Sequence, residues 1–90
     1  MQRAHIIVHG LVQGVFFRSN TREVAQKLEL KGYAKNMADG TVEVVAEGPE
    51  DKIKELIDFC NNGPEAAEVT KVDVKFEEPK NEFESFEVKY

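Results

Sequence analysis

The chain has 90 residues, enough for one small domain with a single core, and we expect residues 1–90 to form that one domain. Its net charge of −5 argues against sequence-independent nucleic-acid binding, and its single cysteine excludes an internal disulfide or a cysteine-based metal site. The apolar run near the start is too short for a signal peptide or a membrane span, which favours a soluble cytoplasmic protein.

A strand and a helix are predicted first. Residues 4–9, AHIIVH, are rich in β-branched residues and predict a buried strand that Gly10 ends. From Ser19 to Lys31 the apolar period becomes helical, and Gly32 is predicted to supply a left-handed stop. The apolar stripe of this helix comprises Phe17, Thr21, Val24, Ala25 and Leu28.

A β-hairpin and a second helix follow. Residues 33–37 predict a short strand, Ala38-Asp39-Gly40 a turn, and residues 41–47 a strand that turns Val42, Val44 and Ala46 inward. The sequence GPED at residues 48–51 opens the second helix with a proline and two acids, and NNGP at residues 61–64 ends it. Its predicted buried stripe is Ile53, Leu56, Ile57 and Cys60.

Two more strands complete the order. Val72, Val74 and Phe76 alternate in a fourth strand, residues 77–82 predict a polar turn, and Phe86, Val88 and Tyr90 alternate in a terminal strand. The acidic stretch from Glu77 to Glu87 is interpreted as solvated surface that protects a sheet edge. This order predicts an α+β, ferredoxin-like βαββαβ sandwich with an added C-terminal strand, with two helices on one face of a mixed, mostly antiparallel sheet.

An anion site is expected near the start of the first helix. Residues 1–36 contain six basic and two acidic residues, a net of +4, whereas residues 37–90 carry −9. Gly10 and Gly14 permit backbone angles that aim successive N–H groups at one point, and Arg18 adds planar, paired donors suited to phosphate. A helix of about 18 Å and a returning strand of about 16 Å bring Asn36 back to the level of this loop.

The motifs at these positions are similar to those of the acylphosphatase family. GLVQGVFFR fits the pattern G-x-V-x-G-V-x-[FY]-R, and GYAKNMADGTVEVVAEG resembles the family's second signature, which places Asn36. The resemblance covers the whole chain, including GPEDKI and FEVKY, although Lys89 stands where the family often has arginine.

The resemblance implies a hydrolase that cleaves acyl phosphates to carboxylate and inorganic phosphate, with neither cofactor nor metal. Arg18 and Asn36 would be the catalytic residues: Arg18 would hold the phosphate and Asn36 would orient the attacking water. The backbone amides of the loop would complete the phosphate site, and the loop consists of Val12, Gln13, Gly14, Val15, Phe16, Phe17 and Arg18. The expected partners are an acyl phosphate substrate and inorganic phosphate as product and inhibitor. The chain is expected to be a monomer without nucleic-acid or membrane partners.

Other phosphate chemistries and a nucleic-acid function do not match the residues of this chain. A Cys-x5-Arg phosphatase would need cysteine at position 12, which is Val12, and no lysine follows Gly14 as in a Walker loop. RNA-recognition modules share the element order, but AHIIVH and TVEVVAE contain no aromatic residue on which a base could stack. The alternative kept open is a non-catalytic or carbamoyl-phosphate-handling anion-binding module that acts with a partner protein.

Other polar residues receive structural interpretations. His5 and His9 lie about 13 Å apart on one strand, too far to share a metal ion, and are expected to be structural or surface residues. Asp39 is expected to shape the hairpin, with at most a minor role as a base, and Cys60 to be an inert core residue.

Overall fold

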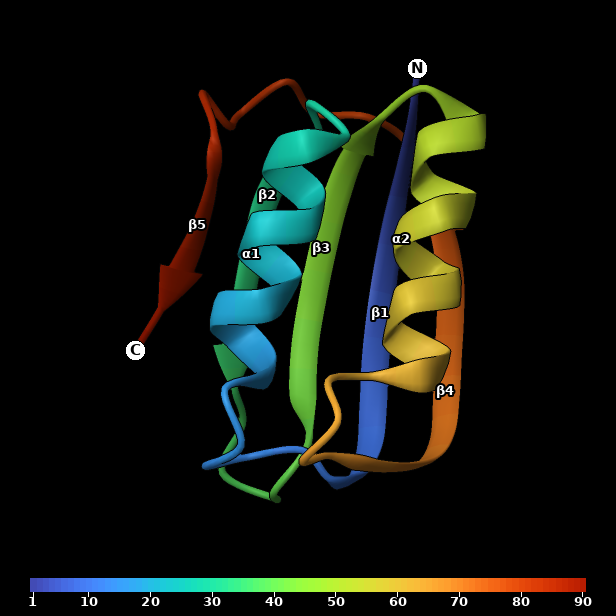
Figure 1. Cartoon of the computed structure of the whole chain (residues 1–90). Helices are drawn as coiled ribbons and strands as arrows, with labels where there is room; N and C mark the ends of the chain where they lie inside the picture. The colour runs from blue at the N-terminus through green and yellow to red at the C-terminus, as the bar shows by residue number, and fades with distance from the viewer.

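The computed structural model describes all of residues 1–90, and the chain forms a five-stranded sheet with two helices on one face (Figure 1). The sheet order is β4-β1-β3-β2-β5, in which only β2 and β5 run parallel. This confirms the predicted ferredoxin-like sandwich with its added strand. No helix is long and apolar enough to cross a membrane. The elements are β1 (Gln2–Leu11), α1 (Phe17–Lys27), β2 (Lys31–Asn36), β3 (Val42–Gly48), α2 (Glu50–Asn62), β4 (Glu68–Glu77) and β5 (Phe86–Lys89).

The core lies between the helices and the inner face of the sheet. The predicted inward residues of β3 are confirmed, since Val42, Val44 and Ala46 are fully buried. Burial does not alternate along β3, however, because Val45 and Glu47 on the other face are buried as well. Facing the inward residues of β3 are the helix residues Phe17, Thr21, Ala25, Ile53, Leu56 and Cys60, all buried as predicted. The alternating apolar residues of β4 are less buried, and Phe76 is 51% exposed. The reason is that β4 is an edge strand.

The prediction that Gly10 ends the first strand is wrong. β1 continues to Leu11, and Gly10 lies opposite Val69 of β4 just after a register shift. A Cβ atom at Gly10 would collide with the carbonyl oxygen of Glu68, so the two backbones approach too closely for any side chain here. Of the two glycines expected to shape the anion loop, only Gly14 therefore lies in it.

The predicted ends of the first helix are also wrong. α1 begins at Phe17 and ends at Lys27, four residues before the predicted end. The left-handed residue is Glu29, with φ 58°, whereas Gly32 lies inside β2. The N–H of Leu30 donates to the carbonyl of Ala25 across Glu29, which closes the helix with a Schellman-type cap.

The predicted polar turn at residues 77–82 is part of a longer connection between β4 and β5. β4 and β5 lie at opposite edges of the sheet, so the segment that joins them crosses behind the face without helices (Figure 1). The N–H groups of Lys80 and Asn81 donate to the Glu47 carboxylate, and the Phe83 ring packs edge-on against Tyr33. The crossing segment thereby covers Glu47, which is 3% exposed.

A buried ion network holds this segment in place. The Arg3 guanidinium binds Glu47 at 2.8 Å, Glu77 at 3.2 Å and Glu82 at 3.0 Å. The prediction that the whole acidic stretch is solvated surface is therefore wrong, because Glu77 and Glu82 bind Arg3. Burial disfavours the charged form of Glu47, but the N–H of Lys80 and the Arg3 guanidinium outweigh this and hold the pKa of Glu47 below its ordinary value.

Replacing Arg3 with methionine is expected to lower the free energy of unfolding by about 3 kcal/mol or more, because it leaves the buried Glu47 carboxylate without its cation. Urea denaturation at pH 7 would measure the loss. The control is Lys27→Met, which breaks an exposed pair with Glu23 and is expected to cost less than about 0.5 kcal/mol. Equal stabilities for Arg3→Met and Lys27→Met would contradict the role of the network.

The difference in unfolding free energy between wild type and Arg3→Met should depend on pH. The pKa of Glu47 lies below its ordinary value of about 4.3, so its ionised form stabilises the fold above that value. This contribution is lost as the pH falls through the lowered pKa. We therefore expect the difference in unfolding free energy between wild type and Arg3→Met to become smaller as the pH is lowered from 7 to 3.

Candidate active site

The site is built first from the loop between β1 and α1. Residues 12–16 have no regular structure, and both Gly14 (φ 75°) and Phe16 (φ 62°) are left-handed. None of the backbone N–H groups of residues 12–16 donates to another group of the protein. Left-handed residues alternating with others gather N–H groups into a concavity suited to an anion. The loop therefore presents uncommitted donors, that is, backbone N–H groups that make no hydrogen bond within the protein.

The start of α1 adds to this concavity. Phe16 occupies the N-cap position, and no side chain caps the helix, so the first-turn N–H groups face outward. The Phe16 carbonyl is turned into the helix, where it accepts from the Asn20 side-chain nitrogen at 2.8 Å and from Ser19 Oγ at 3.1 Å. With the carbonyl held away, the partial positive charge of the helix terminus is open to a ligand.

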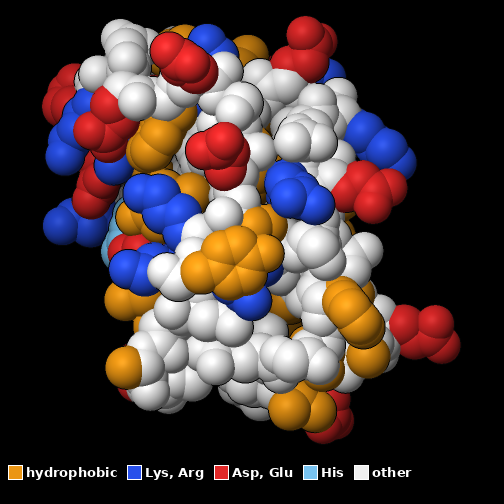
Figure 2. All heavy atoms as spheres, turned by 90° about the vertical axis from the view of Figure 1, so that its left-hand side faces the viewer, with side chains coloured by type: hydrophobic (Ala, Val, Ile, Leu, Met, Phe, Trp, Pro, Cys, Tyr) orange, Lys and Arg blue, Asp and Glu red, His pale blue; other side chains and the backbone are white.

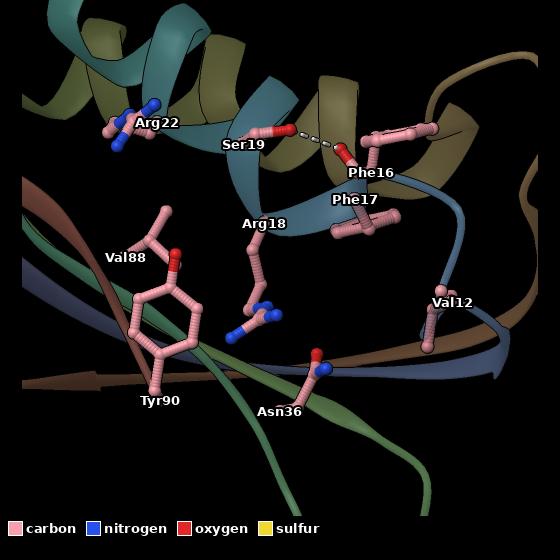
Figure 3. A pocket seen from close by; sticks show the side chains of 10 residues that line it. Val12, Phe16, Phe17, Arg18, Ser19, Arg22, Asn36, Val88 and Tyr90 are labelled. Atoms are coloured by element: carbon pink, nitrogen blue, oxygen red, sulfur yellow. Dashed lines mark hydrogen bonds between the residues drawn. The ribbon is translucent and has the colours of Figure 1, made fainter.

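A pocket of about 300 Å³ opens beside the loop and contains two arginines and no acidic side chain. It brings together Arg18, from the start of α1, and Asn36, from the end of β2, which point toward one another in Figure 3. β3 lies between β1 and β2 in the sheet. The lining residues are Val12, Gly14, Phe16, Phe17, Arg18, Ser19, Arg22, Asn36, Val88 and Tyr90.

Two of the seven predicted loop residues do not line this pocket. Val15 packs against the core instead. The Gln13 side chain turns to the β2–β3 hairpin, where its Nε2 donates to the carbonyls of Met37 at 2.8 Å and Thr41 at 2.9 Å. The sequence motif did not reveal these contacts, because the acceptors are backbone atoms.

Arg18 is held by the C-terminal residues. Its Nη1 donates to the carbonyl of Lys89 at 2.9 Å, and its Cζ lies 4.8 Å from the centre of the Tyr90 ring (Figure 3). The contact uses the backbone of Lys89, while its ammonium lies over Tyr33, so lysine in place of arginine leaves the contact intact. A guanidinium has five N–H donors, so most of them remain available after the bond to Lys89.

Asn36 has an unused acceptor. Its Oδ1 is buried and has no hydrogen-bond partner in the protein. A buried polar atom left unpaired costs about 1–3 kcal/mol, so such atoms ordinarily hold a water or a ligand. Asn36 is thus placed to accept a hydrogen bond from a water in the pocket.

The remaining polar candidates lie outside the pocket. His5 binds Glu43 at 2.7 Å and His9 binds Asp73 at 2.9 Å, so each histidine pairs with a neighbouring strand. Asp39 Oδ1 accepts from the N–H and the hydroxyl of Thr41, and these bonds lower the pKa of Asp39, as suits a residue that shapes the hairpin.

Cys60 is buried and has no disulfide partner, and burial raises the pKa of its thiol to about 12. The thiol is therefore protonated at neutral pH, and the prediction of an inert core residue is confirmed.

The face that carries β5 is locally basic. Figure 2 shows Lys and Arg side chains grouped around a hydrophobic side chain near the middle of this face, while most Asp and Glu side chains lie nearer its upper end. Arg18 and Arg22 both belong to the pocket itself. An acidic protein therefore presents positive charge where its amides are uncommitted.

Known proteins share this arrangement. The acylphosphatase family model matches residues 4–88. An acylphosphatase of Haloarcula marismortui is 44% identical over 88 residues, which span 98% of this chain and 96% of that protein. The crystal structure of the Bacillus subtilis acylphosphatase superposes with a TM-score of 0.95 at 37% identity, and all of both chains is covered.

A full-length HypF structure, with phosphate and nucleotide bound, also superposes, with a TM-score of 0.90 at 30% identity. The match covers 99% of this chain but only 12% of HypF, so the same fold also occurs inside a much longer protein. The family model and the relatives matched along nearly their whole length together show that this chain belongs to the acylphosphatases, hydrolases of acyl phosphates.

Proposed function

We propose that this chain, acting as a single-domain monomer, hydrolyses the carboxyl–phosphate bond of acyl phosphates with Arg18 as phosphate ligand and Asn36 as the residue that orients water. One observation carries the proposal: a single pocket joins a guanidinium and an uncommitted amide oxygen beside a loop of uncommitted N–H groups. The pocket thus combines hydrogen-bond donors for the phosphate of a bound substrate with an acceptor for the attacking water.

In the bound state, the phosphate oxygens accept hydrogen bonds from the backbone amides of residues 12–18 and from Arg18. These donors oppose no carboxylate in the pocket, so they stabilise the charge of the phosphoryl group as it develops. The contact of Arg18 with Lys89 and Tyr90 fixes the guanidinium before substrate arrives, which reduces the entropy lost on binding.

Hydrolysis then requires a positioned water. The Asn36 Oδ1 accepts one hydrogen bond from the water, whose oxygen forms a new bond to phosphorus as the bond from phosphorus to the acyl oxygen breaks in line. The carboxylate leaves without needing a proton. Because an amide cannot take a proton at neutral pH, a phosphate oxygen of the substrate accepts the proton of the water.

The experiment that tests this function is hydrolysis of acetyl, benzoyl and carbamoyl phosphate, each with and without a chelator. We expect hydrolysis that the chelator does not change and that inorganic phosphate inhibits competitively, because phosphate occupies the same donors. Loss of activity on chelation would show that a metal takes part. Failure to hydrolyse any of the three would refute the proposal itself.

The carbamoyl phosphate arm also addresses the alternative of a module that acts with a partner protein. That alternative is not favoured, because acylphosphatases are matched along 96% and 100% of their own length. Hydrolysis of carbamoyl phosphate alone, with acetyl and benzoyl phosphate untouched, would favour it.

A further inference from the structure

The side chain of Gln13 joins the two halves of the candidate site. It leaves the loop and crosses to the β2–β3 hairpin, where Nε2 donates to the carbonyls of Met37 and Thr41 at 2.8 and 2.9 Å. The Gln13 side chain is part-buried in both contacts. Met37 directly follows Asn36, so the bond is anchored one residue from the amide proposed to orient water.

The geometry of the hairpin makes this anchor effective. The N–H of Met37 donates to the Thr41 carbonyl at 2.8 Å, so the two carbonyls that Gln13 binds lie at the two sides of the turn. Asn36 is the last residue of β2, and the turn of the hairpin begins directly after it. Without Gln13, the loop and the hairpin would have no other side-chain hydrogen bond between them.

The chemistry of the contact admits few other side chains. Two carbonyl oxygens require a group with two N–H donors, and the amide nitrogen of glutamine has two. Both are used, so the orientation of the amide is fully determined. Asn36 Oδ1, in contrast, has no hydrogen bond within the protein that fixes its position. Its position therefore depends on the backbone of the hairpin that Gln13 holds.

We infer that Gln13 is a positioning residue, which sets the distance between the phosphate held by the loop and the water held by Asn36. The inference rests on the proposed function and extends it from the loop amide of Gln13 to its side chain. Gln13 acts through Asn36 and touches neither the water nor the phosphate with its side chain. Its removal therefore lowers the rate of the chemical step more than it weakens phosphate binding.

The experiment compares Gln13→Met with Gln26→Met. Methionine keeps the length of glutamine and removes the donors. Gln26 is a matched control, because its Nε2 also donates to a backbone carbonyl, that of Phe86, at 3.2 Å and outside the pocket. Both variants lose a hydrogen bond of the same kind, but only one loses the link between the loop and the hairpin.

For Gln13→Met we expect kcat with acetyl phosphate to fall ten- to a hundred-fold, the range that a misplacement of about 1 Å produces. The inhibition constant of inorganic phosphate should change less than about three-fold. Gln26→Met should retain wild-type kcat. A wild-type kcat for Gln13→Met, or equal losses in kcat and in phosphate affinity, would overturn the inference.

A second measurement does not depend on turnover. The side-chain amide of Asn36 gives its own signal in a nitrogen–proton NMR spectrum, and this signal should shift or broaden in Gln13→Met but not in Gln26→Met. An unshifted signal would overturn the inference. If the wild type hydrolyses no acyl phosphate, the proposed function fails, whereas an active wild type with an active Gln13→Met refutes only the role of Gln13.

Discussion

Replacing Asn36 with alanine is expected to lower kcat for acetyl phosphate by about 100- to 1000-fold while inorganic phosphate still binds. Asn36 contributes nothing to the loop donors, so a phosphate should remain bound by Arg18 and the amides of residues 12–16. The variant loses the buried acceptor that would fix the attacking water, and with it the geometry of the attack. Initial rates and calorimetric titration with phosphate would measure the two quantities separately.

The matched control for this variant is Asn61→Ala. Asn61 is exposed on α2, donates from its side chain to the Ile57 carbonyl, and is not among the residues that line the pocket. It should have wild-type kcat and phosphate affinity. If Asn36→Ala also hydrolysed acetyl phosphate at the wild-type rate, the water would have to be oriented by another group.

The elements were predictable where the pattern of apolar residues decides the structure. The helical stripe of α1 and the inward side chains of β3 follow the pattern of apolar residues, and both are confirmed. The ends of elements were not predictable in the same way. Gly10 marks a close approach to β4, and Glu29 takes a left-handed conformation that a nearby glycine was expected to take.

Long-range contacts explain the remaining differences. Arg3 meets Glu47 and Glu77 because they are its register partners on the neighbouring strands β3 and β4. It meets Glu82 because β4 and β5 lie at opposite edges, so that their connection must cross the sheet. Nothing local in the acidic stretch distinguishes a carboxylate in this network from one in solvent. Only the order of all five strands makes the difference.

The site was predictable as far as side chains define it. Arg18 and Asn36 stand in recognisable motifs, and the structure places both on one pocket. The bonds from Arg18 to Lys89 and from Gln13 to the hairpin end on backbone carbonyls, which every residue possesses. Because any residue type can supply such an acceptor, these contacts could not be predicted from the sequence.

Replacing Arg18 with glutamine is expected to weaken both phosphate binding and turnover, in contrast to the loss in turnover alone at Asn36. Hydrogen bonds to charged groups contribute about 1.5–3 kcal/mol, so we expect phosphate affinity to fall at least ten-fold, and kcat/KM to fall further as charge develops on the phosphoryl group. Arg18→Lys should recover only part of the loss, because an ammonium lacks the paired donors and the planar contact with Tyr90.

Arg22 provides the control that separates a ligand from a background field. It lies one helical turn beyond Arg18 and lines the same pocket, so Arg22→Gln removes the same unit of charge. If Arg18 binds phosphate directly, Arg18→Gln must weaken phosphate binding several times more than Arg22→Gln does. Equal effects would mean that Arg18 acts only through the positive potential of this face, and the phosphate site would then consist of the loop amides alone.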